Sequence, residues 1–234
     1  MGVDFTSLTF QDVTRNFGRR RALNRVSFTC EAGQVVALLG ANGAGKSTLL
    51  SIAATLLEPS EGRVFYGDRA AADGGPALRG RIGVLGHDLY VYPELSAAEN
   101  LTFFGRLYGV NEIGRTVERA LEHAALADRA HDPVSSFSRG MRQRLALERA
   151  LIHSPRLLLL DEPFTGLDDV SSTALRQRLA SARDAGAIVV VTTHDLEAIE
   201  TIVDAAYVLV RGRAEQLRAG VGSLRERYRD HVVS

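Results

Sequence analysis

The segment GANGAGKST, Gly40 to Thr48, constrains the fold more than any other part of the chain. It matches the pattern G-x-x-x-x-G-K-[ST], follows the apolar run QVVALLG and precedes a helical segment that begins near Lys46. Glycines at these places let successive backbone N–H groups point inward and form an anion-binding nest, to which the helix N-terminus adds partial positive charge. The segment therefore predicts a buried strand, a phosphate-binding loop and a helix, in that order.

Lys46 is the only lysine among the 28 lysines and arginines of the chain. A compact ammonium fits a loop filled by amides and phosphate, whereas the larger, rigid guanidinium of arginine would crowd it. We expect Lys46 between the β- and γ-phosphates of ATP, the Ser47 hydroxyl on Mg²⁺, and Thr48 near the α-phosphate. The other loop residues expected to bind ATP are Gly40, Asn42, Gly43 and Gly45.

A pair of carboxylates ends a second apolar run, LLLLDEP. Ligands of open α/β sheets bind at the carboxyl ends of strands, which is where Asp161 and Glu162 are expected. We predict that Asp161 holds Mg²⁺ through water and that Glu162 orients and polarises the attacking water. Two carboxylates that merely cap a strand end are the alternative, and the phosphate-binding loop upstream disfavours it.

Alternating apolar and polar residues in SLTFQDVTRNF and ALNRVSFTCE predict two half-buried antiparallel strands near the N-terminus. The GRRR turn between them is expected to be a solvated loop, with an anion-binding patch as the alternative. Further along, apolar strands alternate with helices, which is typical of a parallel sheet. These strands are expected at 34–40, 82–86, 157–161, 187–193 and 205–210, the last of them being the final strand of the chain.

Helical segments between about 88 and 153 interrupt this alternation. Ser96 and Glu99 form a capping box ahead of a helix that is expected to run to about Tyr108. Further helices are expected at 111–130, 140–153 and 170–185, with a polar, helical tail at 213–234. The predicted fold class is α/β: a P-loop NTPase with a mixed central sheet, an antiparallel β subdomain and a helical subdomain.

The composition excludes several other classes of protein. The 28 acidic residues equal the 28 basic residues in number, so the chain lacks the basic field of a nucleic-acid binder, and no nucleic-acid partner is expected. The lone cysteine, Cys30, excludes an internal disulfide and is expected to be a buried thiol. No apolar run approaches the roughly 20 residues of a membrane helix, so other subunits must cross any membrane involved.

Three further motifs identify a family. FSRGMRQR (137–144) resembles the ABC signature LSGGQ-x-x-R, GLDD (166–169) resembles the D-loop, and TTHD (192–195) resembles the switch-histidine motif. The single lysine also excludes the Asn-Lys-x-Asp guanine reader of GTPases. Taken with the phosphate-binding loop and the carboxylate motif, these stretches cover nearly the whole chain, which is therefore identified as a member of the nucleotide-binding subunits of ABC transporters.

The resemblance implies one nucleotide-binding domain over 1–234, with a core and β subdomain at about 1–87 and 154–212, a helical subdomain at about 88–153 and a tail at about 213–234. It also implies a homodimer in which each ATP lies between the phosphate loop of one copy and the signature helix of the other. Ser138 and Gly140 would donate hydrogen bonds to the γ-phosphate, and Asp168 would help to join the two sites.

Two more residues take roles from the resemblance. His194 would contact the γ-phosphate and hold Glu162 and the attacking water. Phe17 matches the aromatic residue that stacks on adenine, with a core phenylalanine at a strand end as the alternative. ATP would hold the two copies together, and charge repulsion after hydrolysis would release them.

Two departures from the family pattern stand out. The signature reads SRGM, so Arg139 adds bulk and charge beside the phosphate site and Met141 replaces an amide. Activity is expected to survive, because Ser138 and Gly140 are retained. His87 stands where a Q-loop glutamine is usual; a neutral imidazole can accept a hydrogen bond from metal-bound water or ligate the metal directly. A surface histidine without function is the alternative.

LGH followed by LSAAENL, together with SRGMRQR, resembles the ATP-binding subunits of the haem exporters of cytochrome c maturation. That resemblance implies a peripheral subunit on the cytoplasmic face of the inner membrane, driving integral membrane permease subunits. Drug, lipid or polysaccharide exporters are the alternative, and Tyr90 and Tyr92 could contact a permease or simply pack within their loop. A soluble ABC ATPase acting on nucleic acid is disfavoured by the single cassette and the neutral charge.

Overall fold

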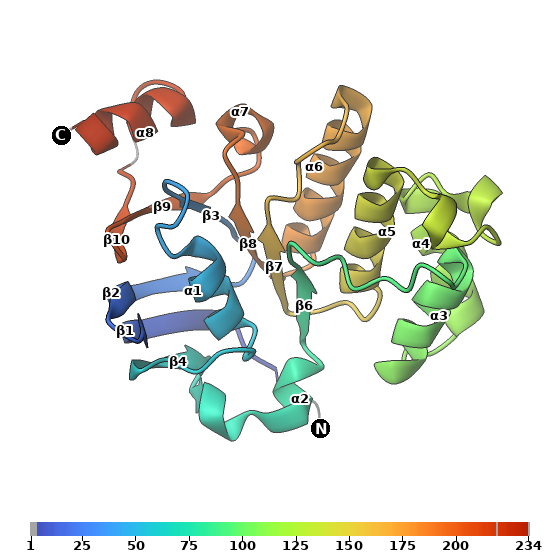
Figure 1. Cartoon of the computed structure of the whole chain (residues 1–234), viewed down its shortest axis with the longest axis horizontal. Helices are drawn as coiled ribbons and strands as arrows, with labels where there is room; N and C mark the ends of the chain where they lie inside the picture. The colour runs from blue at the N-terminus through green and yellow to red at the C-terminus, as the bar shows by residue number, and fades with distance from the viewer. Residues whose placement is uncertain (1–3, 219, 234) are drawn as a thin grey trace.

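The computed structural model describes residues 4–218 and 220–233, and its named strands form two sheets (Figure 1). The first sheet is antiparallel, as the alternating N-terminal pattern predicted, and its strand order is β2-β1-β4-β5. Its strands are β1 (Ser7–Phe17), β2 (Arg20–Glu31), β4 (Glu61–Tyr66) and β5 (Arg69–Ala70).

The second sheet has six strands in the order β10-β9-β3-β8-β7-β6. All neighbours are parallel except β10 and β9, so the mixed central sheet is confirmed. Every residue of β3 and β8 is buried, because layers cover both faces of the sheet. The strands are β3 (Val35–Leu39), β6 (Ile82–Leu85), β7 (Leu157–Asp161), β8 (Ile188–Thr192), β9 (Ala205–Val210) and β10 (Arg213–Gln216).

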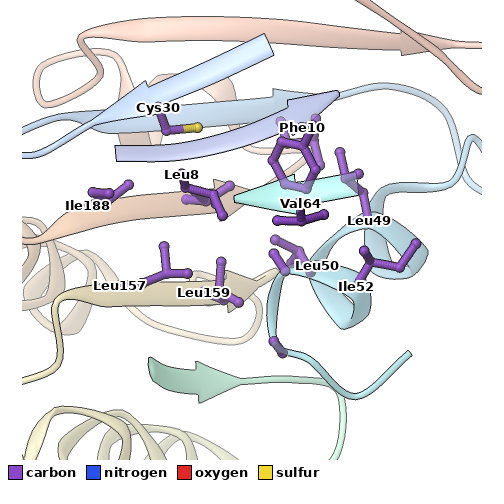
Figure 2. Close-up of a cluster of buried hydrophobic side chains, with 14 of the residues drawn as sticks. Leu8, Phe10, Cys30, Leu49, Leu50, Ile52, Val64, Leu157, Leu159 and Ile188 are labelled. Carbon is purple, nitrogen blue, oxygen red and sulfur yellow. The ribbon is translucent and has the colours of Figure 1, made fainter. Parts of the chain in front are cut away.

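Helix α1 (Lys46–Ala53) packs between the two sheets, and Figure 2 shows its apolar side chains beside those of both. Leu49, Leu50 and Ile52 join one buried cluster with residues of β1, β4, β7 and β8. Cys30 of β2 lies in the same cluster; burial raises the pKa of its thiol to about 12, and the predicted buried thiol is confirmed.

Helices α3 (Ala97–Leu107), α4 (Ile113–His123) and α5 (Arg139–Leu151) gather beyond β6 at one end of the molecule (Figure 1). They surround a separate apolar cluster that includes Leu101, Leu121 and Leu145. The capping box at the start of α3 is confirmed: Ser96 Oγ accepts from the Glu99 amide at 3.2 Å, and Glu99 Oε2 accepts from the Ser96 amide at 2.8 Å.

Of the remaining helices, one packs against the central sheet and two others contact each other. Helix α6 (Asp169–Asp184) packs against β3 and β8, and α7 (Leu196–Ile199) contacts α8 (Leu224–Val233). After β5 the chain forms a 3₁₀ turn at Ala71–Asp73 and then α2 (Gly75–Arg79). None of the helices in residues 4–218 and 220–233 combines the length with the apolar character that a bilayer-spanning segment requires.

Two predictions about secondary structure are wrong. The helix expected over 111–130 ends at His123, because Ala125 adopts a left-handed φ of 50° and turns Leu126 back into the helical cluster. The strand at 205–210 is not the last one: Arg211 and Gly212 take positive φ angles in a two-residue turn, and the polar strand β10 returns beside β9. The tail is therefore helical only in α8, and its residues 219 and 234 lie outside the described residues.

His153 follows α5 and lies half-buried at the junction between the helices and the central sheet. Its ring stacks on Tyr108 with 3.8 Å between centroids, and its Nε2 lies 3.2 Å from the Ile82 carbonyl oxygen. Burial lowers the pKa of His153 from 6.5 to about 4. The neutral form of the imidazole is therefore the one that the fold accommodates.

This burial predicts a pH-dependent stability. As pH falls from 6.5 toward 4, the unfolded chain binds a proton that folded His153 does not, so the free energy of unfolding decreases. Between pH 7 and pH 5 the loss is expected to be about 2 kcal/mol. His153→Phe keeps a ring against Tyr108 and should remove that part of the loss. Urea unfolding at both pH values checks this, with exposed His131→Gln as the control; an unchanged pH difference in His153→Phe would contradict it.

Candidate functional site

A cavity of about 760 Å³ opens at the carboxyl ends of β3, β7 and β8. It brings together residues that are far apart in the sequence, and most of the residues predicted to bind ATP or Mg²⁺ line it. These are Phe17, Asn42, Gly43, Gly45, Lys46, Ser47, Thr48, His87, Asp161, Glu162 and His194. The phosphate-binding loop, the carboxylate motif and the switch-histidine motif therefore converge on one place in the folded chain.

The phosphate-binding loop depends on glycine for steric reasons. Gly43 and Gly45 have φ angles of 78° and 110°, which side chains rarely adopt. A Cβ on Gly45 would also lie 2.7 Å from the Ala22 carbonyl oxygen of β2. Gly40 has a φ of 140° and lies behind the loop, where a Cβ would meet the Leu209 carbonyl oxygen at 2.6 Å. The loop is thus pressed against two strands, and its open side faces the cavity.

Lys46 points along the inside of this loop. Its Nζ donates hydrogen bonds to the Gly40 carbonyl at 2.7 Å and the Ala41 carbonyl at 3.3 Å, and only 7% of the residue is exposed. Burial lowers the pKa of Lys46, while the nearby carboxylates of Glu162 and Asp161 oppose that shift. In this position the Lys46 ammonium could exchange its two carbonyl partners for a charged phosphate group.

Thr192, the last residue of β8, ties the two carboxylate residues together. It is fully buried; its Oγ1 donates to Asp161 Oδ1 and accepts from the Glu162 amide at 3.0 Å. The same amide also donates to the Thr192 carbonyl at 3.1 Å. Glu162 adopts a φ of 52°, an uncommon conformation for a residue with a side chain, and these bonds hold it there.

His194 contacts Glu162 through two groups. Its Nε2 lies 3.2 Å from Glu162 Oε1, and its backbone N–H donates to Glu162 Oε2 at 3.2 Å. Both side chains remain partly exposed to the cavity. The carboxylate is therefore oriented by the histidine on one side and by the backbone bonds of its own residue on the other.

The donor set fits a magnesium ion that is bound together with a nucleotide. Ser47, Asp161 and His87 all line the same cavity. In the described part of the chain no three His, Cys, Asp or Glu residues cluster to hold a metal by themselves. Mg²⁺ commonly binds oxygen ligands, through one or two carboxylates plus substrate phosphates, and the Ser47 hydroxyl and the Asp161 carboxylate match that mode.

Phe17 and Arg20 lie at the mouth of the cavity, on either side of the β1–β2 turn. Phe17 is 47% exposed, so it is not the core residue of the alternative interpretation, and the Arg15 guanidinium lies 4.8 Å from its ring centroid. Arg20 lines the cavity and donates to the Gly43 carbonyl at 3.4 Å. Arg20 was not among the residues expected to bind ATP. The GRRR turn contains it, and the anion-binding patch given as the alternative for that turn was the signal that pointed to it.

The signature residues and Asp168 lie outside this cavity, although Gly166 and Leu167 of the D-loop line it. Ser138 caps α5 by accepting from the Met141 amide at 3.3 Å, and Asp168 caps α6 by accepting from the Ser171 amide at 2.7 Å. That second bond lowers the pKa of Asp168. Arg139 is exposed, whereas Met141 packs partly buried against the cluster of α3–α5. One chain thus does not bring Ser138, Arg139, Gly140, Met141 and Asp168 to its own phosphate loop.

Known proteins similar to this chain are named as ATP-binding proteins. The chain is 37% identical over 223 residues to the ABC transporter ATP-binding protein NatA of Bacillus subtilis, covering 90% of this chain and 91% of NatA. It is 35% identical to the daunorubicin resistance ATP-binding protein DrrA3 of Streptomyces coeruleorubidus, covering 93% and 71%. It is 36% identical to the Nod factor export ATP-binding protein I of Burkholderia lata, covering 88% and 68%.

A solved structure shows the same fold with nucleotide bound. The dimeric, post-hydrolysis ATP-binding cassette MJ0796 bound to ADP and Pi superimposes with a TM-score of 0.82 at 27% identity, covering 91% of this chain and all of that one. The haem-exporter resemblance has no support from the three relatives above, of which one is named for daunorubicin resistance and another for Nod factor export. The ABC transporter family model matches residues 23–165. The chain therefore belongs to the ABC transporter family, as an ATP-binding and ATP-hydrolysing subunit.

Proposed function

We propose that two copies of this chain bind two ATP molecules between them and use hydrolysis to drive membrane subunits of an exporter. The observation that carries the proposal is the division of the site: Glu162, His194 and the phosphate loop share one cavity, while the helix N-termini at Ser138 and Asp168 lie outside it. A second copy can supply those N-termini to the γ-phosphate. The dimeric structure of the related cassette bound to ADP and Pi supports this arrangement.

In this proposal the residues of one copy prepare the attack on the γ-phosphate. The Glu162 carboxylate accepts the proton of the attacking water, and His194 keeps that carboxylate oriented. Lys46 leaves its carbonyl partners for the β- and γ-phosphates, while Asn42, Gly43, Gly45 and Thr48 surround the phosphate chain. Ser47, Asp161 and His87 would hold Mg²⁺, whose charge would neutralise that of the phosphates. Phe17 stacks on the adenine.

The signature residues of the other copy complete the site. Ser138 Oγ is an acceptor in its capping bond, so its O–H is free to donate to a γ-phosphate. The amide of Gly140 and the N-terminus of α5 add partial positive charge, and exposed Arg139 adds a full one. The Met141 side chain packs against the apolar cluster of α3–α5, and we assign it no contact with the phosphate. We also propose that residues 1–234 form one nucleotide-binding domain, which is divided into a core, a β subdomain, a helical subdomain and a tail.

The cargo and the membrane partner that we propose are inferred from the names of relatives and not from the residues of this cavity. Relatives named for daunorubicin resistance and for Nod factor export favour a drug, lipid or polysaccharide exporter over haem handling. A permease would contact the exposed aromatic side chains of Tyr90, Tyr92 and Phe103, which lie between His87 and the end of α3. Such contacts would hold the chain against the cytoplasmic face of the membrane.

Glu162→Gln tests the hydrolytic part. Glutamine keeps the shape of the side chain but does not take the proton, so ATP hydrolysis is expected to fall at least about 100-fold while ATP binding is retained. With ATP and Mg²⁺ the variant should accumulate as a dimer, measured by light scattering alongside phosphate release. Glu197→Gln, an exposed glutamate paired with Arg225, is the control. A Glu162→Gln variant that hydrolyses ATP at the parent rate would refute the assignment.

Arg20→Ala tests the mouth of the cavity. Its guanidinium lies beside the phosphate loop, so its loss is expected to weaken ATP binding about fivefold, through one charge-assisted contact that solvent partly screens. The matched control is Arg19→Ala, since Arg19 belongs to the same turn and is exposed. Binding of a fluorescent ATP analogue to both variants measures the effect. Equal affinities for Arg20→Ala and Arg19→Ala would show that Arg20 does not bind the nucleotide.

Co-purification from the source cells tests the cargo class. A tagged Glu162→Gln chain, held with ATP, is expected to retain a polytopic permease of the drug, lipid or polysaccharide type. Mass spectrometry of the retained proteins identifies it, and the untagged chain is the control. Recovery of two membrane proteins together with a haem chaperone would instead establish the haem assignment and overturn the export proposal.

A further inference from the structure

An ion pair between a buried glutamate and a partly exposed arginine joins α5 to α6 away from the nucleotide cavity. Arg178 Nε and Nη2 donate to Glu148 Oε1 and Oε2 at 2.9 and 3.0 Å. The Glu148 side chain is only 2% exposed, and its Oε2 also lies 3.9 Å from His123 Nδ1 of α4. A buried charge is tolerated when it is paired in a good geometry, and a two-bond fork allows little freedom. The pair therefore restrains the distance between the two helices at this point.

The two helices begin at the two motifs that face a second copy. Helix α5 starts at its cap Ser138 in the signature, and α6 starts at its cap Asp168 in the D-loop. Glu148 and Arg178 each stand ten residues after the cap of their helix, which is about 15 Å along the helix axis. The ion pair thus connects the two helices at the same distance along each helix from its N-terminal motif.

Close contacts also exist at the upper ends of the helices. A Cβ on Gly140 would lie 3.7 Å from the Gly166 carbonyl oxygen, and Gln143 Nε2 donates to the Pro163 carbonyl at 3.3 Å. Below these contacts a cavity of about 270 Å³ separates α5 from α6, with Leu147 and Leu175 in its walls. Glu148 and Arg178 line the same cavity, and their ion pair connects the helices directly across it, beside the apolar cluster that contains Leu147 and Leu175.

We propose that Glu148 and Arg178 are positioning residues that tie the signature helix to the D-loop helix within one chain. The two motifs then meet the other copy as one rigid surface, because a shift of α5 carries α6 with it. Neither residue lines the nucleotide cavity, so neither touches ATP in its own chain. The effect of the pair on the dimer rests on the function proposed above, whereas its effect on the single chain does not.

Hydrogen exchange on the full chain tests the tie without a dimer. Glu148→Gln keeps the shape of the side chain and removes its charge. It is expected to speed amide exchange at least fivefold in two segments together, 139–142 and 167–171. The control is Leu126→Ala, which weakens the helical cluster without contact to α6. Faster exchange in Glu148→Gln near 139–142 alone, or equal patterns in both variants, would overturn the proposal.

Dimer formation gives the functional measurement, in the Glu162→Gln background. Glu148→Gln and Arg178→Gln are each expected to raise the dimer dissociation constant at least tenfold with ATP and Mg²⁺. Affinity of the single chain for a fluorescent ATP analogue should change less than twofold. The double variant should dimerise no worse than the weaker single variant, because both changes remove one interaction.

The outcomes separate this inference from the proposed function. Unchanged dimerisation in both single variants overturns the tie, and so does a loss that Leu126→Ala reproduces in full. If Glu162→Gln alone fails to dimerise with ATP, the proposed function fails. In that case hydrogen exchange decides the tie, since it needs only one chain.

Discussion

The site depends on the register of three parallel strands. Thr192 of β8 pairs with Leu38 of β3 on one side and with Asp161 of β7 on the other, so the three strands end at one level. The phosphate loop, the carboxylates and His194 all follow within a few residues of this level. A slip of one residue would turn the buried leucines and valines toward the wrong layer. Apolar packing on both faces of the sheet thereby sets the geometry of a polar site.

Within this frame the charges are held by short chains of hydrogen bonds. Thr192 fixes Asp161 and the Glu162 amide, and Glu162 is held in turn by His194. Lys46 lies on carbonyl oxygens with the two carboxylates nearby. These groups are oriented before any nucleotide arrives, so binding needs little rearrangement of the protein. The strained backbone of Glu162 is the local cost of presenting its carboxylate to the cavity.

The helices on the outer side of the molecule have a different task. Their N-termini at Ser138 and Asp168 lie outside the cavity that contains the chain's own phosphate loop, and the two helices are joined by the ion pair of Glu148 and Arg178. In a pair of subunits, each copy can offer a preformed surface to the nucleotide of the other, which links ATP binding to association.

Much of this protein is determined by local sequence. Glycines at fixed spacing, a lysine before a helix and two carboxylates after an apolar run specify a phosphate site, because backbone conformation and strand ends are local properties. The period of apolar residues likewise predicted the central strands and the capped helix α3. Local pattern failed at Ala125 and at the polar strand β10, where the turn back to a distant cluster or strand overrides it. Only the tertiary structure placed Arg20 beside Gly43, Thr192 between Asp161 and Glu162, and Arg178 on Glu148. Those pairs join residues far apart in the chain, and packing of the sheets and helices, not spacing in the sequence, decides which side chains meet.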